Sequence, residues 1–221
     1  MNSRCMKKYI LICLSLLLMT ACERDKRAWR FSYIQSYYTY SDIQLNAVGN
    51  GMEIDVLPVN SEFLADIEGN GDRLAYENLR AHYGDNSCSN PSYGGHIVSG
   101  AFAIDYKSIE LIAQCAWDGS HAQGSSLADV TTVHLRSYYP FIASGYKEYR
   151  AYSVGAVIPL SNVEPADLLM LGVLSPQRIN EAKIATINIT PPAEAGEYPI
   201  TVKMITTDGQ VFEKSITLTV E

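Results

Sequence analysis

The chain has 221 residues, 47% hydrophobic and 19% charged, a globular composition that excludes an intrinsically disordered protein. This length is sufficient for one undivided sandwich or barrel domain. Acidic residues outnumber basic ones by 24 to 17, which argues against a nucleic-acid partner because phosphates require a basic face.

Residues 1–21 have the organisation of a secretory signal peptide. Three basic residues precede the apolar run YILICLSLLLM at 9–19, and the small Thr20 and Ala21 follow it. The run is shorter than the roughly 20 apolar residues that span a bilayer. Removal of this leader takes 3 of the 17 basic residues, so the rest of the chain carries 14 against 24 acidic residues, a net charge of −10.

Cys22 stands directly after the small residues, and the sequence Met19-Thr20-Ala21-Cys22 resembles the lipobox of bacterial lipoproteins. In that class the leader is cleaved before the cysteine, whose thiol carries a diacylglycerol and whose new amino group is usually acylated. Two or three acyl chains hold a protein stably because each buried methylene contributes about 0.8 kcal/mol. The resemblance implies a lipid attachment at Cys22, with residues 22–30 as anchor and tether.

Glu23 and Asp25, just after the cysteine, resemble the acidic export signals of Bacteroidetes surface lipoproteins. The resemblance implies a protein of the cell envelope, anchored in the outer membrane and facing either the surface or the periplasm. Its partner would then be the membrane itself, through the lipid. The alternative is an ordinary signal peptide that is followed by an incidental cysteine.

Residues 31–221 have the pattern of a single β domain. IQLNAV at 43–48 and MEIDVL at 52–57 flank Gly49-Asn50-Gly51, a turn sequence that predicts a hairpin. IVSGAFAIDY at 97–106 and IELIAQCAW at 109–117 form a second predicted pair. In the latter, apolar residues at period two predict a face toward the core: Ile109, Leu111, Ala113, Cys115 and Trp117.

Five further strands are predicted toward the carboxyl end: VTTVHL (130–135), AVIPL (156–160), IATINIT (184–190), EYPITVKMIT (197–206) and VFEKSITLTV (211–220). Pro159 suits an edge strand, which needs no amide donor there. Asp208-Gly209 between the last two strands predicts a hairpin. With about nine short strands separated by turn residues, the sequence predicts an all-β, antiparallel sandwich.

Two segments do not fit a strand pattern well. RLAYENLRAHY at 73–83 has the composition of a helix, but we predict a strand there on the family resemblance described next. ADLLMLG at 166–172 follows Pro165 and predicts a short helical turn.

The stretch IELIAQCAWDGSHAQGSSLADV, residues 109–130, resembles the signature of an uncharacterised family of Bacteroidetes lipoproteins. The matching positions are His121, Gly124, Ser125, Ser126, Leu127 and Asp129. The closing stretch ITPPAEAGEYPITVKMITTDGQVFEKSITLTV resembles the last hairpin of that family. The resemblance implies an anchored, immunoglobulin-like β-sandwich and supplies no catalytic residues.

The sequence contains few residue patterns that are typical of catalytic, metal-binding or cofactor-binding sites. The sequence has none of the motifs of nucleophile elbows, zinc helices, phosphate loops or dinucleotide-binding folds, so we predict no catalytic residue, no metal and no cofactor. The loop from Asp118 to Asp129 contains two carboxylates, His121 and three serines. Such a loop can hold calcium or a hydrolytic site, but it more often satisfies its own backbone, which is the interpretation we favour.

Tyrosine is enriched, with 15 residues against five phenylalanines and two tryptophans. In SYYPFIASGYKEYRAYS we single out Tyr138, Tyr139 and Tyr146 as candidate binding residues, because tyrosine offers an apolar face and a polar tip to sugars and proteins. Packing is the alternative, since tyrosine also half-buries well in sheets.

Cys88 and Cys115 are the cysteines that remain beyond Cys22, and an exported pair is a candidate disulfide. The alternative is that Cys115 fills the core as a thiol.

For the whole chain we expect a non-catalytic, anchored module that binds a glycan or a partner protein of the envelope. The alternatives are a structural or assembly role in an envelope complex and a hydrolase with an unrecognised site.

Overall fold

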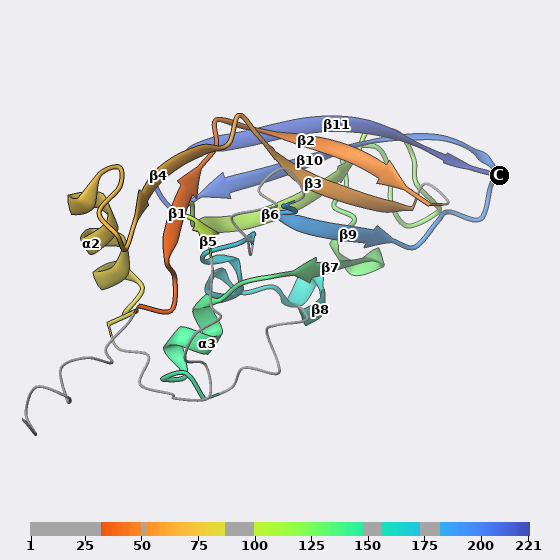
Figure 1. The fold of residues 1–221 in the computed structure, drawn as a ribbon. Coiled ribbons are helices and arrows are strands. Elements are labelled where there is room, and N and C mark those ends of the chain that lie inside the picture. Colours follow the sequence, from red (N-terminus) through yellow and green to blue (C-terminus); the bar gives the residue numbers. More distant parts are fainter. Residues whose placement is uncertain (1–31, 50–51, 87–99, 148–155, 173–181) are drawn as a thin grey trace, which may run out of the picture.

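The computed structural model describes residues 32–49, 52–86, 100–147, 156–172 and 182–221. These residues form eleven strands in three sheets, two more strands than expected. The all-β class is confirmed, and every strand pair is antiparallel except the pair of β1 with β5. Figure 1 shows two large sheets as layers, with a small sheet and a helix at one end and the C-terminus at the other.

The five-stranded sheet has the order β2-β3-β9-β7-β8. Its strands are β2 (Asp42–Val48), β3 (Glu53–Val59), β9 (Ala185–Ile189), β7 (Thr131–Leu135) and β8 (Ala156–Pro159). The predicted hairpin of β2 with β3 is confirmed, with Leu45 opposite Val56. β8 lies at the edge of the sheet, which is the place that Pro159 favours.

The facing sheet has the order β11-β10-β6. Its strands are β6 (Tyr106–Ala113), β10 (Gly196–Thr206) and β11 (Val211–Val220). The predicted hairpin around Asp208-Gly209 is confirmed, and Gly209 adopts a φ of 92°, the left-handed backbone that favours glycine.

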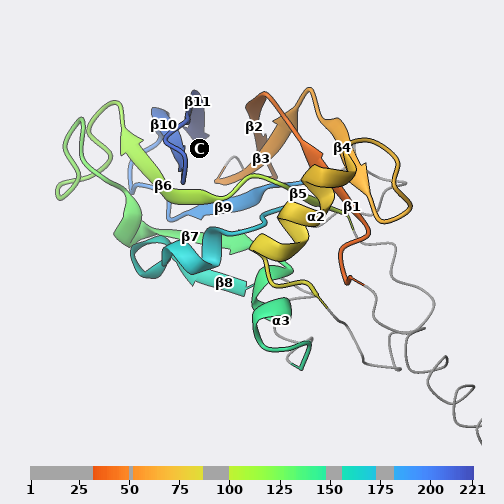
Figure 2. The same ribbon diagram turned by 90° about the vertical axis from the view of Figure 1, so that its left-hand side faces the viewer.

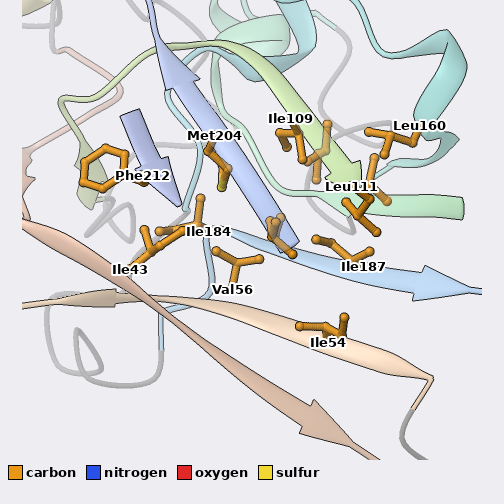
Figure 3. Close-up of a cluster of buried hydrophobic side chains, with 14 of the residues drawn as sticks. Ile43, Ile54, Val56, Ile109, Leu111, Leu160, Ile184, Ile187, Met204 and Phe212 are labelled. Carbon is orange, nitrogen blue, oxygen red and sulfur yellow. The ribbon is translucent and has the colours of Figure 1, made fainter. Parts of the chain in front are cut away.

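The main core lies between these two sheets. Figure 3 shows Ile54, Val56 and Ile187 of one sheet pointing toward Leu111 and Met204 of the other. The predicted core face of the 109–117 segment is also confirmed: Ile109, Leu111, Ala113 and Trp117 are buried, and Cys115 is half-buried. Period-two alternation therefore places one face of each strand in the core and leaves the other outside.

The small sheet extends the first hairpin. β1 (Ser36–Thr39) and β4 (Glu62–Asp66) continue the antiparallel pairing of β2 and β3, with Thr39 opposite Glu62. Between the two parts, Asn60 has a φ of 55° and its amide donates to the Ser41 hydroxyl at 3.0 Å. β5 (Gly100–Phe102) completes this sheet beside β1.

The predicted strand at 73–83 is wrong, because this segment forms the helix α2 (Arg73–His82). The Asp72 side chain caps it by accepting the N–H of Ala75 at 3.0 Å, and its residues are mostly good helix formers. Tyr76, Leu79 and Tyr83 fall on one face at helical spacing and pack into a smaller cluster beside the small sheet. Local propensity and a side-chain cap thus outweigh the family resemblance.

The predicted pairing of 97–106 with 109–117 is also wrong. β5 pairs in parallel with β1, and β6 pairs with β10. The reason is burial: all of β5 is buried beside β1 in the small sheet, whereas β6 places its apolar face against the main core.

The short helical turn predicted beside Pro165 is confirmed as the 3₁₀ helix η4 (Pro165–Leu168). Proline occupies the first position of this turn, where its missing amide donor costs nothing. Leu168 is buried in the main core, so the turn packs against that core.

The smaller cluster also receives the helix α3 (Tyr139–Ala143), while the short 3₁₀ helices η2 (Ala128–Val130) and η3 (Leu160–Asn162) flank the main core. The buried members of the smaller cluster are Tyr33, Ile34, Tyr37, Ala65, Tyr76, Tyr83, Ala101, Phe141, Ile142 and Met170. The cluster combines residues that are distant in sequence, from Tyr33 to Met170.

Asp85 is the polar centre of the smaller cluster and is fully buried. Its carboxylate accepts the backbone N–H groups of Tyr33 at 2.7 Å and Ile34 at 2.8 Å, and the hydroxyl of Tyr146 at 2.7 Å. Burial raises the pKa of this carboxyl, and the three donors oppose that rise. One side chain thus holds together three segments that are distant in sequence.

Replacement of Asp85 by alanine is expected to lower the free energy of unfolding by at least about 2 kcal/mol, since the two buried backbone donors of Tyr33 and Ile34 lose their acceptor and each such loss costs about 1–3 kcal/mol. Urea unfolding followed by circular dichroism measures this loss. Asp72→Ala is the control, because it removes one exposed helix cap worth about 1 kcal/mol. Equal losses in the two variants would contradict the central role of Asp85.

Candidate functional site

A hollow of about 280 Å³ lies on the outer face of the five-stranded sheet. Its lining is mostly polar and comes from β3, β7 and β9, from the exposed Val157 of β8, and from residues that flank these strands. The lining residues are Glu53, His134, Arg136, Val157, Lys183, Ile184, Ala185, Thr186 and Asn188. Figure 2 shows β9, β7 and β8 side by side, as the register requires.

Strand register builds the hollow from residues that are distant in sequence. Thr186 of β9 lies opposite Asp55 of β3 on one side and opposite His134 of β7 on the other, and His134 lies opposite Val157 of β8. The neighbours of Thr186 along β9, Ala185 and Ile187, are buried, so Thr186 points outward. One row of side chains therefore crosses four strands on the solvent side.

Asp55 is a buried carboxylate beside the hollow, and two lining residues hold it in place. It is only 7% exposed, and its carboxylate contacts the ammonium of Lys183 at 2.6 Å and accepts the hydroxyl of Thr186 at 2.9 Å. A buried carboxylate with both oxygens occupied stays in place, which limits the motion of Lys183 and Thr186. The positions of Lys183 and Thr186 are therefore preorganised for a ligand.

None of the candidate site residues that were predicted from the sequence is among the described residues that line this hollow. The alternation in TTVHLR at 131–136 and in ATINI at 185–189 marks His134, Arg136, Thr186 and Asn188 as outward residues. This alternation identifies the outward residues of each strand. It does not predict that β7 and β9 are neighbours, because the two strands are far apart in the sequence.

The candidate tyrosines lie elsewhere, around α3 and against the smaller cluster. All three are half-buried. Tyr138 packs edge-on against Tyr33 with ring centroids 5.1 Å apart, Tyr139 packs against Tyr83 at 6.3 Å, and Tyr146 bonds to Asp85. Their observed contacts are those of packing residues, and a binding role for them stays a prediction.

The loop from Asp118 to Asp129 forms a histidine clamp, which consists of Asp118, His121 and Asp129. The His121 ring is nearly buried, with Nδ1 2.8 Å from an oxygen of Asp118 and Nε2 2.9 Å from an oxygen of Asp129. Only the protonated ring donates from both nitrogens. Since both nitrogens are occupied by carboxylates, His121 is not placed to act as a base toward a neighbouring nucleophile.

The clamp shifts all three titrations. Hydrogen bonds to Asp118 and then to Asp129 raise the pKa of His121. The Ser120 N–H and the His121 ring lower the pKa of Asp118, and the His121 ring lowers that of Asp129. Across the described ranges, no group of three or more histidine, cysteine or acidic side chains is arranged to hold a metal ion.

The clamp is expected to stabilise the fold most between about pH 4 and pH 6.5, the ordinary pKa values of the acids and the imidazole. The histidine contribution is complete below its unfolded pKa and is lost as pH rises through the raised folded value. The aspartate contributions are present above their unfolded pKa and are lost as pH falls through the lowered folded values.

We therefore expect His121→Gln to destabilise the protein more at pH 5.5 than at pH 8.5, measured by urea unfolding at both pH values. His82→Gln is the control, because the side chain of His82 is 61% exposed and pairs with one carboxylate only. A loss for His121→Gln that does not change with pH would contradict a charged clamp.

The remaining predicted residues lie partly outside the described ranges. Cys22 and Cys88 fall there, so the lipid attachment and the disulfide stay predictions. Cys115 is half-buried and makes no disulfide within the described part of the chain.

Comparison with protein-family models, with curated proteins and with solved structures gives no match for this chain. Within the described residues, no helix combines the length and the apolar character that crossing a bilayer requires.

Proposed function

We propose that this chain is a non-catalytic, lipid-anchored protein of the cell envelope whose β domain binds a glycan in the hollow of the five-stranded sheet. The observation that carries the proposal is the set of outward polar side chains that line the hollow, with Thr186 and His134 opposite each other in the strand register and Asn188 and Glu53 farther along. The anchor part rests on the leader and the lipobox at Cys22.

The chemistry of the lining supports a glycan more than a protein. Carboxylate, amide, imidazole and hydroxyl groups offer both donors and acceptors, which suits adjacent hydroxyls of a sugar. The centre of a protein interface is usually apolar and aromatic, whereas Val157 is the one strongly exposed large apolar side chain among the described lining residues. Recognition would therefore depend on hydrogen bonds and less on ring stacking.

The finer fold assignment also belongs to this proposal. Two mainly antiparallel sheets that face each other, with a long hairpin at the carboxyl end, support an immunoglobulin-like sandwich. The family of Bacteroidetes lipoproteins that residues 109–130 resemble stays a proposal of the same kind.

We expect His134→Ala and Asn188→Ala to weaken glycan binding by about ten-fold each, the loss that corresponds to a removed hydrogen bond of about 1.4 kcal/mol. The measurement is a screen of neutral and acidic oligosaccharides, followed by calorimetry on the mature, full-length chain.

Asn46→Ala is the matched control for these variants. Asn46 lies on the same sheet, opposite Asp55, is exposed and does not line the hollow. Its binding should equal that of the wild type. Unchanged binding in His134→Ala and Asn188→Ala would remove the hollow as the glycan site.

A second candidate function, assembly within an envelope complex, is favoured by one observation. Three large apolar side chains are exposed here: Phe63 of β4 by 46%, Ile67 directly after β4 by 38%, and Leu74 of α2 by 71%. Exposed apolar side chains on neighbouring elements are typical of interaction surfaces. If Leu74→Ser and Phe63→Ser abolished co-purification with envelope proteins while glycan binding was absent, assembly would replace the leading proposal. A hydrolase is the least favoured candidate.

The anchor is tested separately. Cys22→Ser should release the protein from the membrane fraction and abolish labelling by a fatty-acid probe, because the acylated thiol is then missing. Ser125→Ala, far from the lipobox, is the control that should stay labelled and membrane-bound. Labelling of the Cys22→Ser variant would contradict lipid attachment at this residue.

A further inference from the structure

The hollow has two chemically different ends. Leu135 pairs with Ala185 at the start of β9, and Arg136, the next residue, lines the hollow there together with Lys183. Glu53 pairs with Asn188 near the end of β9 and lines the other end. A ligand that lies along β9 therefore meets cations at one end and a carboxylate with an amide at the other.

Arg136 is the cation that is available to a ligand. Its guanidinium makes no hydrogen bond or ion pair with another residue of the described ranges, and its side chain is exposed. Lys183, in contrast, is paired with Asp55 at 2.6 Å. The planar guanidinium presents parallel N–H donors that match the two oxygens of a carboxylate.

The acidic end fixes the orientation of such a ligand. The Glu53 carboxylate repels a second carboxylate but accepts hydrogen bonds from hydroxyl groups, and the Asn188 amide both donates and accepts. The chain beyond the leader carries a net charge of −10, so attraction for an anion is local to the Arg136 end.

We propose that the hollow selects an acidic sugar, namely a uronic acid residue whose carboxylate pairs with Arg136 while the hydroxyls of the sugar bind Asn188 and Glu53. This inference rests on the glycan-binding function proposed above and adds the chemical class of the sugar. A neutral sugar leaves the guanidinium without a counter-charge and gains only the hydroxyl contacts.

The test compares trigalacturonic acid with the same trisaccharide after reduction of its carboxyl groups, by calorimetry on the mature, full-length chain. We expect the acid to bind at least about ten-fold more tightly, and Arg136→Gln to remove most of this difference. Sodium chloride at high concentration should weaken binding of the acid and leave the neutral trisaccharide unaffected.

Lys107→Gln is the matched control variant, because it removes one positive charge from an exposed position on β6, in the other large sheet. It should bind both trisaccharides like the wild type. Lys183 is left unchanged, since its substitution would also strand the buried carboxylate of Asp55.

Three results would overturn the inference in distinguishable ways. Equal binding of the acid and the neutral trisaccharide would remove the acid preference and leave the glycan-binding function standing. Preference for the acid that survives in Arg136→Gln, or that is lost equally in Lys107→Gln, would show that Arg136 does not supply it. Binding of neither trisaccharide, nor of any glycan in the wider screen, would remove the proposed function together with the inference.

Discussion

Burial of one face of each large sheet is the constraint on which the rest of the molecule depends. Ile54, Val56 and Ile187 must point toward Leu111 and Met204, because apolar area removed from water is the main favourable term in folding. Because successive side chains of a strand point to opposite faces, the residues between these core residues face the solvent. The polar hollow is the consequence of this constraint: Thr186 and His134 are brought together outside because Ile187 and Val133 are packed inside.

The smaller cluster shows a second way to join distant segments. The first hairpin bends at Ser41 and Asn60 and leaves the main sandwich, so β1 and β4 need their own cover. The aromatic side chains of α2 and α3 cover these two strands. Asp85 connects this cluster to the backbone at Tyr33. Because Asp85 is buried, its hydrogen bonds matter more there than they would at the surface.

The polar clusters of the chain differ in how much they leave open for a ligand. In the histidine clamp, His121 has a carboxylate on each ring nitrogen, so the groups satisfy one another. The Asp85 carboxylate is buried and is occupied by the donors of Tyr33, Ile34 and Tyr146. The hollow is different, because it is lined by Arg136. The Arg136 guanidinium has no carboxylate partner in the described part of the chain. This difference is the reason why we propose a binding site on the sheet face and not in the loops.

The sequence by itself determined the β class, both hairpins, the core face of 109–117 and the turn at 165–168, because period two, Asp-Gly turns and proline act within a few residues. Tertiary structure alone decided that β5 leaves β6 to join β1, that 73–83 serves as a helical cover, and that β7 lies beside β9. Alternation names the outward residues of a strand but not its neighbour. Since the hollow combines residues from several strands, it exists only once burial of the two cores has set the order of those strands.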